Sequence, residues 1–173
     1  MTAVTNGRLE KLSELFRRYR DPLYTFLLRR TNGDQGIAED LLQDTFERIL
    51  KYRSSYRNNQ PFKAWAYTIA RNVLNDQLKR AGRMPLKDGF DFGTLPLDNR
   101  SANSCWEEHE DQGRMLAALN GLSSNYREVV DLAWKRELKY AEIARILNTS
   151  ESNVKVRMHR ACKQLQANYQ KLS

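Results

Sequence analysis

A stretch without helical periodicity, between Gly82 and Asn103, constrains the fold of this chain more than any other feature. On both sides of it, apolar residues recur at three- and four-residue steps, as on one face of an amphipathic helix. Inside it, Gly and Pro recur among Asp and Asn. This composition is typical of a linker, and irregular segments of this length are uncommon inside one compact domain. The sequence therefore predicts an all-α protein with two small helical domains, 1–81 and 103–173, joined by a flexible acidic linker at 82–102.

Three amphipathic helices are predicted in the first domain. The first has an apolar stripe that ends at Leu27, and Pro22 should kink or locally break it. The second begins near Asp34, a suitable N-cap, and ends near Tyr52. The third has Pro61 in its first turn. Residues expected to face the core are Ala38, Leu41, Leu42, Thr45, Phe46 and Ile49 in the second helix, and Phe62, Trp65, Ala66, Ile69, Val73 and Leu74 in the third.

The second domain is predicted to end in a short helix, 140–147, a turn at 148–150, and a longer helix from about 151 to 169. Two further helices precede them, one opening with a capping box at Ser104 and Glu107 and one following Ser123. The helical pattern of the first continues through Met115, Leu116 and Leu119. Residues expected to face inward in the last two helices are Ala141, Ile143, Ala144, Leu147, Val154, Met158, Ala161, Cys162 and Leu165. This succession is the plan of a helix-turn-helix, whose second helix enters the major groove of DNA.

The last helix has a polar and basic side opposite its apolar stripe. Such a side can meet base edges and phosphates together, and the small Ala141 and Ala144 suit a close crossing of the two helices. The alternative interpretation is a solvated basic helix in a small bundle. The outward residues are Ser152, Asn153, Lys155, Val156, His159, Arg160 and Lys163.

Charge is distributed in blocks. Residues 1–81 carry a net charge of +6, residues 82–113 a net −4 and residues 114–173 a net +6, within an overall +8. Basic surface on both domains fits a polyanionic partner, because Lys and Arg displace counterions from phosphate backbones.

The third helix of the first domain has a row of polar residues at four-residue steps, interpreted as an exposed stripe that can follow a nucleic-acid backbone. Tyr52, Tyr56, Phe62 and Trp65 place aromatic rings near the preceding polar loop, and such rings can stack on unpaired bases. For Trp65 the alternative is a core position. The stripe consists of Lys63, Tyr67, Arg71, Asn75 and Lys79.

The outer face of the second helix is acidic, although the domain is basic. It carries Asp40, Gln43, Asp44 and Glu47. Carboxylates repel phosphate, so we expect this face to point away from DNA. It is either a solvated surface or a surface for a protein partner.

Other classes of protein are not indicated. No apolar run is long enough to span a bilayer, and the first eight residues lack the apolar centre of a secretion signal, so we expect a cytoplasmic protein. Cys105 and Cys162 are expected to be reduced, structural thiols. Cys105 and His109 have helical spacing for half a metal site, but no second pair of ligands is evident. We expect no metal, no cofactor and no catalytic residues.

The ordered motifs resemble those of extracytoplasmic-function (ECF) sigma factors, group 4 of the sigma-70 family. They are Ala38 to Phe46 (AEDLLQDTF), Phe62 to Trp65 (FKAW), Ile69 to Asn72 (IARN), Tyr140 to Ala144 (YAEIA) and Val154 to Ala161 (VKVRMHRA). The resemblance covers almost the whole chain. Three positions depart from common family patterns, namely Leu122-Ser123, Ser152-Asn153 and Val156, and they leave the promoter sequence open.

The resemblance implies a function for each surface. The first domain would be sigma region 2, whose acidic helix binds the clamp helices of the largest subunit of core RNA polymerase. Its third helix and preceding loop, with Tyr56 and Asn58, would read and open the minus-ten element. The last helix would read the minus-thirty-five element as part of region 4, which also meets the polymerase flap. The free protein would be a monomer held inactive by an anti-sigma factor, which is often membrane-bound.

Two other functions remain open from the residues alone. A dimeric helix-turn-helix regulator would bind its operator without polymerase. An enzyme acting on nucleic acid would need clustered acids for a metal, and the acids here lie on one exposed helix face.

Overall fold

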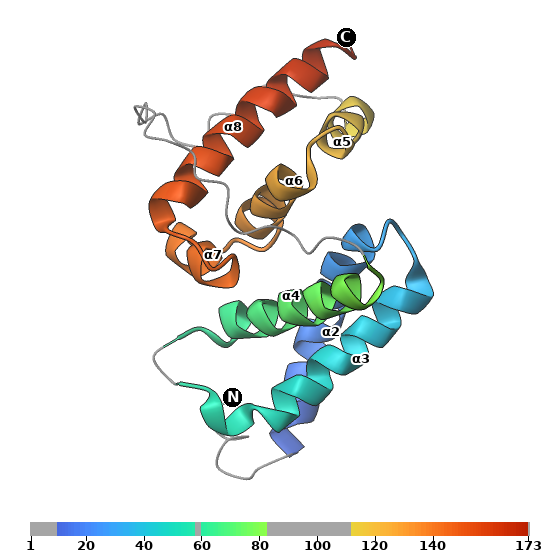
Figure 1. The fold of residues 1–173 in the computed structure, drawn as a ribbon, viewed down its shortest axis with the longest axis vertical. Helices are drawn as coiled ribbons and strands as arrows, with labels where there is room; N and C mark the ends of the chain where they lie inside the picture. The colour runs from blue at the N-terminus through green and yellow to red at the C-terminus, as the bar shows by residue number, and fades with distance from the viewer. Residues whose placement is uncertain (1–9, 58–59, 83–111, 173) are drawn as a thin grey trace. The chain divides into compact units, whose positions relative to one another are not determined.

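The computed structural model describes residues 10–57, 60–82 and 112–172, and every regular element within these ranges is helical (Figure 1). The chain divides into two compact units, Met1–Pro85 and Leu86–Ser173. The all-α fold predicted from the sequence is therefore confirmed. The expected linker, apart from Gly82, and the capping box at Ser104 and Glu107 lie outside the described residues.

Unit 1 is a bundle of α2 (Glu10–Arg30), α3 (Gln35–Lys51) and α4 (Phe62–Arg80), with a single 3-10 turn, η1 (Arg53–Ser55), after α3. Each of the three helices packs against the other two (Figure 1). All six residues of α3 that were expected to face the core are buried, because its apolar positions repeat at the helical period.

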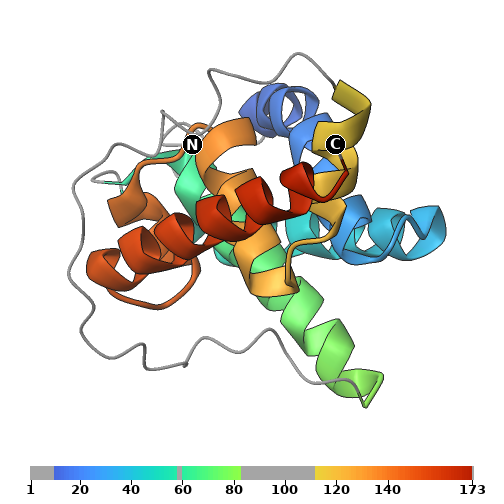
Figure 2. The same cartoon turned by 90° about the horizontal axis from the view of Figure 1, so that it is seen from above.

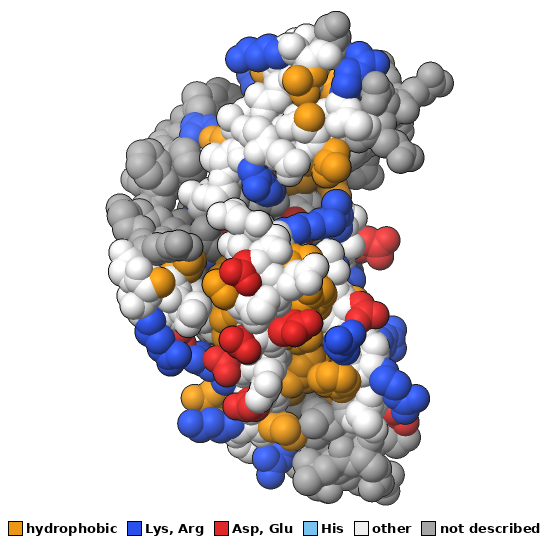
Figure 3. Space-filling view, turned by 90° about the vertical axis from the view of Figure 1, so that its right-hand side faces the viewer, with side chains coloured by type: hydrophobic (Ala, Val, Ile, Leu, Met, Phe, Trp, Pro, Cys, Tyr) orange, Lys and Arg blue, Asp and Glu red, His pale blue; other side chains and the backbone are white. Residues whose placement is uncertain are grey.

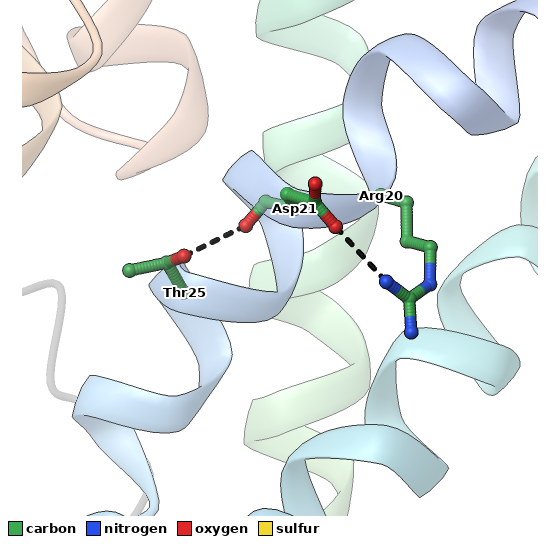
Figure 4. A network of polar contacts seen from close by, with 3 residues as sticks. All are labelled: Arg20, Asp21 and Thr25. Atoms are coloured by element: carbon green, nitrogen blue, oxygen red, sulfur yellow. Dashed lines mark hydrogen bonds and ion pairs between the residues drawn. The ribbon is translucent and has the colours of Figure 1, made fainter.

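Of the two outcomes expected at Pro22, a kink or a local break, the break does not occur, because α2 continues through the proline. A proline inside a helix costs about 3 kcal/mol, since it removes one hydrogen bond and crowds the preceding turn. Burial of Leu23, Phe26 and Leu27 directly after it offsets this cost, at about 1.5–3 kcal/mol for each side chain. Beside the proline, the hydroxyl of Thr25 donates to the Asp21 carbonyl at 2.8 Å, and Arg20 pairs with the Asp21 carboxylate at 3.0 Å (Figure 4).

The start of α3 follows the expected capping chemistry. Asn32 and Gly33 have positive φ angles of 54° and 85° and turn the chain after α2. The Asp34 carboxylate then accepts a hydrogen bond from the Ile37 backbone N–H at 3.0 Å. This bond satisfies one of the donors that the first turn of a helix leaves unpaired. At α4, Pro61 is the N-cap itself, one residue before the predicted first turn.

Unit 2 contains α5 (Gln112–Asn120), α6 (Ser124–Val130), a π-helical turn η3 (Asp131–Lys135), α7 (Tyr140–Ile146) and α8 (Glu151–Gln170). The long helix α8 packs against α5, α6 and α7 (Figures 1 and 2). Its buried apolar residues are Val154, Met158, Ala161 and Leu165, as expected.

Two residues of unit 2 that were expected to face inward are not buried. Ala141 is exposed, and Cys162 is only half-buried. A helix turns by about 100° per residue, so Ala141 lies about 200° around α7 from the buried Ile143. Ala141 therefore lies on the outer side of its helix. Within the described ranges, no helix is long and apolar enough to cross a membrane.

Candidate nucleic-acid and protein interfaces

The turn between α7 and α8 is held by both side-chain and backbone hydrogen bonds. Asn148 adopts a φ of 50°, and the Thr149 N–H donates to the Ala144 carbonyl at 2.9 Å. The Ser150 hydroxyl accepts from the Asn153 N–H at 3.1 Å, and the Asn153 amide donates to the Thr149 hydroxyl at 3.1 Å. Because these bonds join the turn to the first residues of α8, they fix the direction in which α8 begins.

One side of α8 is available to a ligand. Ser152, Lys155 and His159 are exposed on it, and Asn153, Val156 and Arg160 are partly exposed. Lys155 lies 3.3 Å from Glu151, a surface ion pair that contributes little to stability. The six candidate residues for DNA contact thus share the accessible side of the helix. Arg157, in contrast, lies among the buried residues of α8.

The acidic face of α3 is exposed as predicted. It consists of Asp40, Gln43, Asp44 and Glu47. The Gln43 amide donates to the Glu47 carboxylate at 3.0 Å. Beside this face, Ile37, Leu41 and Gln77 help to line a surface hollow of about 300 Å³. Acidic and hydrophobic side chains lie next to one another on the lower part of the surface in Figure 3.

The stripe expected to be exposed along α4 is wrong for two of its five residues. Tyr67 is 0% and Arg71 3% exposed, whereas Lys63 and Asn75 are partly exposed and Lys79 is exposed. Four residues turn a helix by about 400°, so a row at four-residue steps shifts by about 40° per step and winds around the helix. Its middle enters the core, where the Tyr67 ring packs edge-on against Phe26 with centroids 5.1 Å apart.

Tyr56 belongs to an aromatic cluster at the start of α4. Its ring centroid lies 5.1 Å from that of Trp65 and 6.2 Å from that of Phe62, which also contacts Tyr19. Its hydroxyl donates to the Gln60 carbonyl at 2.7 Å. Burial and, to a smaller extent, Tyr19 raise the pKa of Tyr56 above its ordinary value.

The loop after Tyr56 is described only in part. Asn58, which was expected to act beside Tyr56, lies outside the described residues. Trp65 is half-buried, so it is neither a full core residue nor a fully exposed one. Tyr52 is exposed. Sequence patterns alone did not indicate that the Tyr56 ring packs on Trp65, since Tyr56 lies outside any helical period.

Metal binding is not supported by the residues that the structure describes. Within ranges 10–57, 60–82 and 112–172, no three His, Cys, Asp or Glu side chains form a group that can hold a metal ion. The helical pair considered from the sequence, Cys105 and His109, lies outside these ranges.

A helix-turn-helix with an accessible basic side and a separate helical bundle with an acidic face define the class of a DNA-binding transcription factor. Comparison with known proteins identifies the family. Residues 15–84 match the family model of Sigma-70 region 2, and residues 112–165 match that of Sigma-70, region 4. The ECF RNA polymerase sigma factor SigM of Bacillus subtilis is 32% identical over 159 residues, which cover 91% of this chain and 94% of SigM.

Two solved structures share the fold. The sigma factor RpoE of Bartonella quintana, in complex with the anti-sigma factor NepR, has a TM-score of 0.66 at 23% identity, covering 92% of this chain and 96% of RpoE. CnrH, in complex with the cytosolic domain of CnrY, has a TM-score of 0.63 at 24% identity, covering 94% of this chain and 90% of CnrH. The chain belongs to the ECF RNA polymerase sigma factors of the sigma-70 family. It is a non-enzymatic initiation factor that directs RNA polymerase to promoters.

Proposed function

We propose that α8 reads the minus-thirty-five promoter element from the major groove. The observation that carries this proposal is the division of α8 into two sides. Its apolar side packs in unit 2, while its other side stays accessible behind the capped turn. Arg160 and Lys155 supply charge, and Asn153 and His159 supply hydrogen-bonding groups for base edges. The proposed contact residues are Ser152, Asn153, Lys155, Val156, His159 and Arg160.

The acidic face of α3 is the proposed contact with core RNA polymerase, through the clamp helices of its largest subunit. Asp40 and Asp44 are one helical turn apart and both exposed, and like charges at this spacing destabilise an isolated helix. A basic partner surface would remove that repulsion. Gln43 and Glu47, already joined by a hydrogen bond, complete the proposed contact.

The start of α4 and the preceding loop are the proposed site for the minus-ten element. Tyr56, Asn58 and Lys63 would meet the opened strand, because stacking a base on an aromatic ring contributes about 1–3 kcal/mol. Asn75 and Lys79 would meet the backbone further along α4. Tyr67 and Arg71 are buried, so their proposed role is to support the helix.

An anti-sigma factor is the proposed regulator of this chain. RpoE and CnrH, which share its fold, were solved in complex with the anti-sigma factor NepR and the cytosolic domain of CnrY. A partner of this kind would mask the polymerase-binding surfaces of a monomeric sigma factor in the cytoplasm.

The experiment that tests the proposed function combines core-polymerase binding with run-off transcription from a library of promoters. We expect this chain to bind core polymerase and to select promoters with two separate elements. An ordinary dimeric regulator would instead bind its operator without polymerase. Failure to bind core polymerase would overturn the assignment of α3.

The proposed minus-ten site has its own test. Permanganate footprinting with Tyr56→Ala and Asn58→Ala together should show slower promoter opening, and a promoter already mismatched across the minus-ten element should restore activity. Tyr56→Phe is the matched control, because it keeps the ring and removes only the hydroxyl that donates to Gln60. Normal opening of the matched promoter by the double variant would exclude this loop as the capturing element.

A further inference from the structure

The first half of α2 has no part in the proposed contacts with DNA or polymerase. No side chain is buried in residues 13–21 of this helix. Two rings nevertheless join this half to the rest of unit 1. Phe16 packs against Phe46 of α3, with ring centroids 4.7 Å apart. Tyr19 packs edge-on against Phe62, the first residue of α4, with ring centroids 4.9 Å apart. Tyr19 therefore reaches the proposed minus-ten site at the start of α4.

Phe62 connects Tyr19 to Tyr56. Only 9% of Phe62 is exposed, and its ring contacts the Tyr56 ring edge-on at 6.2 Å and the Trp65 ring at 5.9 Å. Aromatic rings prefer edge-on or offset arrangements to a face-to-face sandwich, so such a contact restricts the orientation of both rings. Burial and, to a smaller extent, Tyr19 raise the pKa of Tyr56, so the Tyr19 phenol lies close enough to act on the Tyr56 phenol. The position of the Tyr19 ring is thus coupled to that of the Tyr56 ring.

The orientation of the Tyr56 ring matters for the proposed capture of an unpaired base. A ring that is already held in its binding orientation loses less side-chain freedom when a base stacks on it. Tyr56 lies just after η1 and outside the α-helices. Its hydroxyl is fixed by the Gln60 carbonyl at 2.7 Å, and its ring by Phe62 and Trp65 of α4. Of the four rings in this cluster, Tyr19 alone comes from α2, so it supports Phe62 from a helix other than α4.

We propose that Tyr19 is a positioning residue for promoter opening, whose ring holds Phe62 and, through it, the Tyr56 ring in the orientation that stacks on an unpaired base of the minus-ten element. This role rests on the proposed capture of that base by Tyr56. Tyr19 acts without touching DNA, since its effect passes through Phe62. The first half of α2 thereby takes part in promoter opening through one of its two aromatic contacts, while the other, of Phe16 with α3, serves packing alone.

Permanganate footprinting of promoters bound by the full chain and core polymerase tests this role. Tyr19 is half-buried, so Tyr19→Leu should fold, and it should slow opening of a matched promoter by about three- to tenfold because the Tyr56 ring is no longer held in advance. A promoter already mismatched across the minus-ten element should restore activity. Opening should be normal with Tyr19→Phe, which keeps the ring, and with Phe16→Leu, which removes the other aromatic contact of the same half of α2. Normal opening with Tyr19→Leu, or equal slowing with either of the other two variants, would overturn the positioning role.

A second experiment shows whether Tyr19 acts through Tyr56. If it does, Tyr19→Leu should slow opening no further in a chain that already carries Tyr56→Ala. The same slowing by Tyr19→Leu in both backgrounds would overturn the positioning role and leave the proposed minus-ten site intact. Normal opening with Tyr56→Ala alone would instead overturn the proposed site itself, and the role of Tyr19 with it.

Discussion

Helices α4 and α8 both carry candidate DNA-binding residues, but they are packed in different ways. Nine of the 19 residues of α4 are buried, compared with five of the 20 residues of α8. Helix α4 packs against α2 and α3, and its middle passes through the core of unit 1. Helix α8 packs along one side and keeps the other accessible. A surface for promoter DNA can therefore extend along α8, whereas the stripe predicted along α4 is interrupted by the buried Tyr67 and Arg71.

The largest effect is expected at Tyr67, in the middle of α4. Tyr67→Ala should lower the free energy of unfolding of unit 1 by about 3–5 kcal/mol, because it removes a fully buried aromatic ring packed on Phe26. On α8, the exposed His159→Ala should change the stability of unit 2 by less than about 0.5 kcal/mol. Chemical denaturation monitored by hydrogen exchange measures the free energy of unfolding of each unit separately. Equal effects at the two positions would contradict the difference in packing.

The acidic face of α3 should show the next largest effect, on polymerase binding and not on folding. Asp44→Lys places a positive charge against a proposed basic surface, which should weaken binding to core polymerase by roughly 2–4 kcal/mol. The exposed Asp44 contributes little to stability, so the melting temperature should stay almost constant. Glu39→Lys, which reverses another exposed charge on the same helix, is the matched control in these affinity measurements. Unchanged polymerase affinity of the Asp44 variant would remove this face from the interface.

A smaller and less specific effect is expected at Lys155. If its ammonium group meets a phosphate, Lys155→Ala should weaken binding to all promoters similarly and lower the salt slope by about one. The substitution also removes the exposed ion pair with Glu151, which should change the stability of α8 little. Titrations at several salt concentrations, on intact and scrambled upstream elements, measure both quantities. A loss confined to one promoter sequence would instead show that Lys155 reads a base.

The smallest expected effect concerns the cap of α8. Ser150→Ala removes the acceptor for the Asn153 N–H and should destabilise the start of α8 by about 1 kcal/mol. Hydrogen exchange of the first-turn amides should increase, while exchange near Leu165 should change little. Asp34→Ala, which removes the corresponding cap of α3, is the matched substitution in unit 1. Stronger protection of the α8 amides after Ser150→Ala would contradict this role of the cap.

The sequence predicted those elements in which one helical period and one capping residue decide the structure. The core side of α3 and the cap at Asp34 are of this kind, because they depend on neighbours in the chain. The prediction of an exposed stripe on α4 was wrong for two residues. A row at four-residue steps does not remain on one side of a helix, and α4 packs against two others. The local break considered at Pro22 does not occur, because tertiary burial offsets a local cost that is all the sequence shows.

Two features of the candidate sites depend on contacts between segments far apart in sequence. Arg157 lies within the basic part of α8, so its burial is not visible from composition, and only its position three residues after Val154 signals it. The packing of the Tyr56 ring on Trp65 joins a loop to a helix and has no periodic signature. Both residues matter through the geometry of the folded chain.

The reading of the upstream element by α8 is measured by run-off transcription from promoters scanned through both elements, with His159→Ala and Arg160→Ala combined in the full chain. Neither substitution removes a buried residue, so the variant should fold and bind core polymerase normally. We expect that promoter strength no longer depends on the upstream element, while dependence on the minus-ten element remains. Unchanged dependence on the upstream element would show that the accessible side of α8 is not the surface that reads it.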